Sequence, residues 1–143
     1  MELCEYSAYE LQRILRRKET SAVEILNAFL KRIDDVDGRP GALDSGPRTE
    51  EDKLKVHAFI TPTPERALAQ AEAVDKQLAA GEDPGPLAGI PFTVKDIFCV
   101  QDTNSTAASR ILANFRAPYT ATPVERMEKA GAVMLGKLNL DEF

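Results

Sequence analysis

The chain has 143 residues, 43% of them hydrophobic, which is enough apolar material for one domain with a buried core. Its 18 Lys and Arg against 23 Asp and Glu give a net charge of −5 without any basic block, and this disfavours direct binding of nucleic acid. The two cysteines, Cys4 and Cys99, lie far apart and predict neither a disulfide framework nor a zinc site. No apolar run is long enough to span a membrane, so we expect a cytoplasmic protein that binds no membrane.

Two amphipathic helices are predicted at the start of the chain. Ser7 and Glu10 have the spacing of a capping box, and a basic segment follows the first apolar stripe. Ser21 and Glu24 repeat the box at the start of the second helix. That helix carries an apolar stripe that should be buried, formed by Val23, Ile25, Leu26, Phe29, Leu30 and Ile33.

Residues 34–55 are predicted to form a surface loop. Asp, Gly and Pro crowd together in this segment, and a charged run closes it. The segment is longer than most connections within a domain, and we expect no chemistry there.

The rest of the chain alternates predicted strands with predicted helices. We expect strands over 56–61 and 92–97 and a buried strand over 132–135. Between them we expect two helices: one is capped by Thr63 and ends at Gly81, and the other starts at Thr122 and stops at Gly131. Continuous apolar strands joined by helical crossovers are typical of parallel pairing. The predicted fold class is α/β, with N-terminal helices and the first part of a mixed, largely parallel sheet covered by helices.

Lys95 is the first residue with a chemical interpretation. It lies inside the apolar strand candidate 92–97, where a lysine would lose its contact with water. Desolvation disfavours the ammonium form, and a neutral buried amine is a competent general base. The alternative is a structural ion pair with Asp96 or another carboxylate, although adjacent strand residues point to opposite faces. The residues themselves leave both interpretations open.

Several longer motifs stand in the order found in a known family. These are Gly85–Ile97, Ser105–Leu112, Ala121–Met127 and Ala130–Phe143. Together they resemble the amidase signature family, and within it the group of glutamine-hydrolysing A subunits of tRNA amidotransferases. The likeness is specific from Gly85 onward and looser before that residue.

The resemblance implies a serine amidohydrolase that uses a nucleophilic Ser, a second Ser in a cis peptide, and a Lys. Lys95 matches the family's lysine, which accepts a proton relayed through the cis-serine while the nucleophile attacks the amide carbon. Asn139 and Asp141 match positions close to the active centre, and we expect them to support Lys95. Neither a metal nor a cofactor is expected in this chain.

In members of the family, the Gly/Ser-rich segment that carries both serines follows the motif Asp-Glu-Phe. The present sequence departs from the family because it ends at Phe143, the last residue of that motif. We therefore expect residues 1–143 to be the N-terminal portion of a single amidase domain, with an incomplete amidase signature fold and no activity alone. Ser105 and Ser109 precede the expected position of the nucleophile, so they are predicted to be structural or hydrogen-bonding residues near the site.

For a whole protein of this group, the resemblance implies glutamine as the substrate and B and C subunits as partners. The B subunit would use ATP and Mg to activate the glutamyl group of misacylated Glu-tRNA(Gln), and it would receive the ammonia for protein biosynthesis. Two alternatives stay open: a general amidase for small amides, and a non-catalytic module that binds another subunit.

Overall fold

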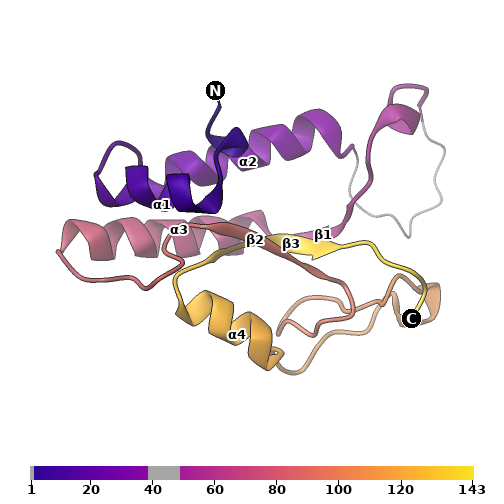
Figure 1. The fold of residues 1–143 in the computed structure, drawn as a ribbon. Helices are drawn as coiled ribbons and strands as arrows, with labels where there is room; N and C mark the ends of the chain where they lie inside the picture. The colour runs from indigo at the N-terminus through magenta and orange to yellow at the C-terminus, as the bar shows by residue number, and fades with distance from the viewer. Residues whose placement is uncertain (1, 39–48) are drawn as a thin grey trace. The chain divides into compact units, whose positions relative to one another are not determined.

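The computed structural model describes residues 2–38 and 49–143. The helices are α1 (Ala8–Arg16), α2 (Ala22–Val36), α3 (Pro64–Ala79) and α4 (Thr122–Lys129), and the strands are β1 (Phe59–Pro62), β2 (Pro91–Lys95) and β3 (Val133–Leu138) (Figure 1). Short 3-10 turns lie at Leu3–Glu5, Asp52–Leu54 and Arg110–Leu112. No helix in the described ranges is long and apolar enough to cross a membrane. The predicted α/β class is confirmed.

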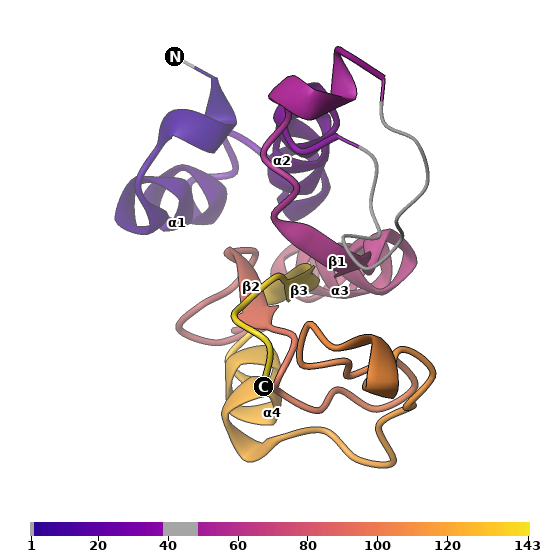
Figure 2. The same cartoon turned by 90° about the vertical axis from the view of Figure 1, so that its right-hand side faces the viewer.

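The strands form a three-stranded sheet in the order β1-β3-β2 (Figure 2). β1 runs antiparallel to β3, with Phe59 opposite Leu138, Thr61 opposite Lys137 and Pro62 opposite Gly136. On the other side of β3, the Val133 N–H donates to the Ile90 carbonyl and the Asp96 N–H to the Leu138 carbonyl, each at 2.9 Å. Residue numbers rise together across these bonds, so β2 runs parallel to β3. The sheet is mixed, as predicted.

Both predicted capping boxes are present. The Ser7 N–H donates to Glu10 Oε2 at 2.8 Å and the Glu10 N–H donates back to Ser7 Oγ at 3.3 Å. Ser21 and Glu24 repeat this exchange at 2.9 and 3.1 Å. The backbone N–H of the capping serine holds the pKa of each glutamate below its usual value. Each box therefore stabilises its helix above the ordinary glutamate pKa, and this stabilisation is lost as pH falls through the lowered value.

Several predicted boundaries were displaced. α2 continues to Val36, past the predicted loop start at residue 34, and residues 39–48 of that loop lie outside the described residues. β1 begins at Phe59 rather than at residue 56, because His57 has a φ of +55°, which is incompatible with a strand. β3 is longer than predicted and includes Lys137.

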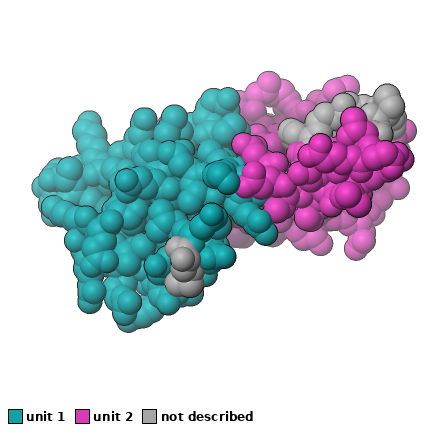
Figure 3. Space-filling model, turned by 90° about the horizontal axis from the view of Figure 1, so that it is seen from above, with its two compact units in different colours: residues 1–32, 63–92, 126–135 teal, residues 33–62, 93–125, 136–143 magenta. Residues whose placement is uncertain are grey.

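The described chain divides into two compact units, which Figure 3 distinguishes by colour. Unit 1 holds residues 1–32, 63–92 and 126–135, and unit 2 holds residues 33–62, 93–125 and 136–143. In unit 1, the buried face of α2 centres on Ala22, Ile25 and Leu26, whereas Val23 and Leu30 of the predicted stripe are half-buried. The core of unit 2 includes Phe59, Ile60, Val100, Ala107, Ala117 and Val124.

Gly136 is required where β3 passes β1. Its φ is +154°, and a Cβ there would stand 2.7 Å from the Thr61 carbonyl oxygen and 2.9 Å from Pro62 Cα. Because these are backbone atoms of a paired strand, we expect Gly136→Ala to lower the free energy of unfolding by about 1–3 kcal/mol in urea titrations. Gly81→Ala is the matched control, since Gly81 has a φ of +78° but nothing within 4 Å of the added Cβ. A smaller loss at Gly136 than at Gly81 would contradict this account.

Candidate functional site

Lys95 is the last residue of β2, and β2 lies at the edge of the three-stranded sheet. Its side chain is exposed and has no hydrogen-bond or ion-pair partner among residues 2–38 and 49–143. Its backbone carbonyl accepts the Phe98 N–H at 3.0 Å, so the chain turns immediately after the strand. The expectation of a buried Lys95 is therefore wrong for the described structure, because an edge strand that ends at this residue leaves the amine in contact with water.

The buried lysine is Lys137, in the central strand β3. Its side chain and that of Asp96 are both 0% exposed, and Lys137 Nζ lies 2.8 Å from Asp96 Oδ1. The ammonium also donates to the Asn104 carbonyl at 2.8 Å and to Ser105 Oγ at 2.5 Å. Asp96 thus takes part in an ion pair, as the structural alternative allowed, but its partner is Lys137 and not Lys95.

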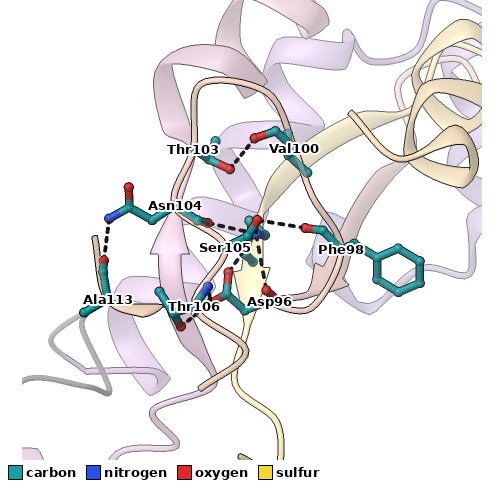
Figure 4. Close-up of polar contacts among 9 residues, drawn as sticks. Asp96, Phe98, Val100, Thr103, Asn104, Ser105, Thr106 and Ala113 are labelled. Atoms are coloured by element: carbon teal, nitrogen blue, oxygen red, sulfur yellow. Dashed lines mark hydrogen bonds and ion pairs between the residues drawn. The ribbon is translucent and has the colours of Figure 1, made fainter. Parts of the chain in front are cut away.

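The rest of the Asp96 carboxylate is satisfied by Thr106. Oδ2 accepts the Thr106 backbone N–H at 2.7 Å and also the Thr106 hydroxyl, and Figure 4 shows these groups converging. The Asp96 carbonyl accepts the Ala107 N–H at 3.4 Å. One buried carboxylate therefore joins the end of β2 to the 104–107 segment and to β3.

Ser105 and Ser109 are both buried and both form hydrogen bonds, in agreement with their predicted structural role. Ser105 Oγ accepts from Lys137 and donates to the Phe98 carbonyl at 3.3 Å. The Ser105–Lys137 distance suits proton transfer, yet the Asp96 carboxylate holds the ammonium and Ser105 is only 5% exposed, so this pair does not present a nucleophile to a substrate. Ser109 Oγ donates to Glu142 Oε1 at 2.8 Å.

Asn139 and Asp141 are exposed and lie beyond the end of β3. The Asn139 N–H donates to the Ala58 carbonyl at 2.7 Å, and its side-chain oxygen accepts the Leu140 N–H at 3.0 Å. In the described part of the chain, neither side chain forms a hydrogen bond or ion pair with Lys95. Their supporting role stays a prediction.

The end of the chain passes beside the 105–109 segment. The Phe143 N–H donates to the Ala107 carbonyl at 3.0 Å, next to the Ser109–Glu142 bond. Ala107 and Ala108 have φ values of +48° and +56°, a left-handed conformation that is uncommon for alanine. The segments that carry Asp96, Thr106 and Glu142 therefore meet within unit 2, with the free amine of Lys95 next to Asp96 in the sequence.

Other groups in the described residues offer less chemistry. No set of three or more His, Cys, Asp or Glu residues there could hold a metal ion. Cys99 is half-buried, and its hydrogen bond raises the pKa of the Tyr119 hydroxyl. The Lys95 amine, by contrast, has no hydrogen-bond or ion-pair partner among residues 2–38 and 49–143.

Comparison with known proteins assigns the fold to a family. The sequence profile of the amidase family matches residues 46–143. The chain belongs to the amidase family. This amidase chain is 48% identical over 143 residues to the A subunit of the glutamyl-tRNA(Gln) amidotransferase of Geobacter metallireducens, and 46% identical to that of Moorella thermoacetica. It spans 26% of the length of each relative.

Solved amidases share the arrangement of elements. The native peptide amidase from Stenotrophomonas maltophilia superposes with a TM-score of 0.77 and 32% identity, over 96% of this amidase chain and 25% of that chain. Lys95, Asp96 and Lys137 all lie inside the segment that matches the family profile.

The buried Asp96–Lys137 pair is the feature of this amidase that sequence reasoning missed. The sequence carried a signal for it, because Lys137 closely follows the apolar run 132–135 in the same way that Lys95 follows the apolar residues of the strand candidate 92–97. Which of the two lysines is buried depends on strand order, and β3 rather than β2 is the central strand.

Proposed function

We propose that this chain supplies the general base, Lys95, of an amidase that releases ammonia from glutamine for the amidation of misacylated Glu-tRNA(Gln). The observation that carries the proposal is the identity of 46–48% along the whole chain to two A subunits of glutamyl-tRNA(Gln) amidotransferases. The Lys95 amine has no polar partner among the described residues, so it is free to contact the rest of an amidase domain, and this supports the proposal.

In the proposed reaction, Lys95 Nζ accepts a proton that leaves the nucleophilic serine through a second serine. The serine oxygen bonds to the amide carbon of glutamine, the C–N bond breaks, and the nitrogen leaves as ammonia after taking up a proton. Water then hydrolyses the acyl-enzyme to glutamate. Backbone N–H groups would stabilise the oxyanion. Both serines would come from outside residues 1–143.

The whole protein would act with B and C subunits in the cytoplasm. ATP and Mg would be used on the B subunit to activate the tRNA-bound glutamyl group, which then reacts with the ammonia in protein biosynthesis. Units 1 and 2 would both be parts of a single amidase domain. We propose no direct contact of this chain with tRNA, in keeping with its net charge of −5.

A second candidate is a general amidase for small or peptide amides. It is favoured by the likeness to the peptide amidase at 32% identity. The two candidates share the chemistry at Lys95 and differ in the substrate.

The test is a chimaera in which residues 1–143 replace the matching quarter of the A subunit from Geobacter metallireducens, produced with that organism's B and C subunits. We expect it to release ammonia from glutamine, whereas the isolated chain releases none. A preference for small amides would support the second candidate. A chimaera that assembles with B and C but hydrolyses no amide would contradict catalysis and favour a module that only binds its partners. The unaltered relative is the positive control.

A further inference from the structure

We infer that Asp96 and Lys137 are positioning residues, which fix the end of β2 so that the neighbouring Lys95 amine is held where the reaction needs it. The inference rests on the proposed function of Lys95.

The Lys95 side chain has no hydrogen bond or ion pair that could orient it in the described part of the chain. The position of the Lys95 side chain therefore depends on the backbone. The backbone N–H, the carbonyl and the carboxylate of the next residue, Asp96, are all held by neighbouring groups. The Asp96 N–H donates to the Leu138 carbonyl at 2.9 Å and the Asp96 carbonyl accepts the Ala107 N–H. Its carboxylate is held by Lys137 on one oxygen and by Thr106 on the other.

The geometry sends the two neighbouring side chains in different directions. Lys95 is the last residue of β2, and Asp96 is the first residue of the turn that follows it. Asp96 is 0% exposed, whereas Lys95 is exposed. Anchoring the buried Asp96 side chain therefore fixes the backbone from which the exposed Lys95 side chain projects.

The charged nature of the pair points to positioning rather than to stability. Replacing a buried ion pair by well-packed apolar residues of similar size often leaves stability unchanged or raises it, because both charges lose their hydration on burial. Apolar side chains, however, form no directional hydrogen bonds that could fix the position of a neighbouring segment. Lys137 Nζ reaches Asp96, the Asn104 carbonyl and Ser105 Oγ at once, so it ties two separate loop segments to the central strand.

The decisive experiment removes both charges together. In the chimaera, Asp96→Asn combined with Lys137→Met leaves no unpaired buried charge, and the side-chain amide introduced at position 96 keeps an oxygen that can accept from Thr106. We expect the double variant to assemble with B and C, to lose about 100-fold in kcat through misplacement of the base, and to keep its KM for glutamine. Lys76→Met is the control, since Lys76 is exposed on α3 and should leave kcat unchanged. A folded double variant with full kcat would overturn the inference.

A second measurement separates this inference from the proposed function. In the isolated chain, amide hydrogen exchange should accelerate at position 96 and at Thr106 in the double variant, while the amides of Val133 and Met134 keep their protection. If the parent chimaera is inactive, the proposed function fails, and the exchange result still decides whether the pair fixes the end of β2. Unchanged exchange at position 96 would contradict the positioning role.

Discussion

Lys137→Met should lower the free energy of unfolding of the chain by about 3–5 kcal/mol, because it leaves the buried Asp96 carboxylate without its counter-ion. Both side chains are 0% exposed, so water cannot replace the lost ammonium without opening the core. The Asn104 carbonyl and Ser105 Oγ would lose a donor as well. Since small domains have a total stability of about 5–15 kcal/mol, the yield of folded protein should also fall. Urea unfolding followed by circular dichroism measures the change.

Two variants show whether this loss comes from the unpaired charge. Lys76→Met changes an exposed lysine and should stay within about 0.5 kcal/mol of the parent. Adding Asp96→Asn to Lys137→Met should recover most of the loss, because the remaining partner is then uncharged. If Lys137→Met is as stable as Lys76→Met, the two side chains do not form a buried ion pair.

Lys95→Ala in the chimaera should reduce ammonia release from glutamine by roughly 100- to 10,000-fold, the usual contribution of a positioned acid or base. The unfolding midpoint should not change, because the Lys95 side chain is exposed and has no polar partner among the described residues. Lys95→Arg should be equally inactive, since a guanidinium stays protonated and cannot accept the proton. Initial rates at saturating glutamine give the comparison.

The control for this prediction is Lys76→Ala, which should keep the parent rate. A Lys95→Ala chimaera with a rate close to that of the parent would exclude Lys95 as the general base. Loss of activity together with loss of assembly would instead indicate a structural role.

Local signals in the sequence predicted much of the fold. The starts of α1 and α2 follow from capping boxes whose members lie three residues apart, and Gly81 follows α3 in a left-handed conformation as expected for a helix end. Such features depend on neighbours along the chain, and they were placed correctly. The family and its α/β class followed from longer motifs in a fixed order.

Non-local features were not predictable in the same way. The start of β1 depends on Asp37, whose buried carboxylate accepts the N–H groups of Ala58 at 2.6 Å and Phe59 at 3.2 Å. The burial of Lys137 and the exposure of Lys95 depend on strand order, which places β3 between β1 and β2. Both lysines lie in similar apolar runs, so the sequence pattern does not distinguish them.

Lys95 and Lys137 should differ most clearly in how accessible their amines are to a reagent in solution. Brief acetylation of the isolated chain at neutral pH, followed by peptide mass spectrometry, measures the reactivity of each amine. We predict that Lys95 reacts as readily as the exposed Lys76, and that Lys137 stays unmodified until urea unfolds the chain. Acetylation of Lys137 at the rate of Lys95 in the folded chain would contradict the account.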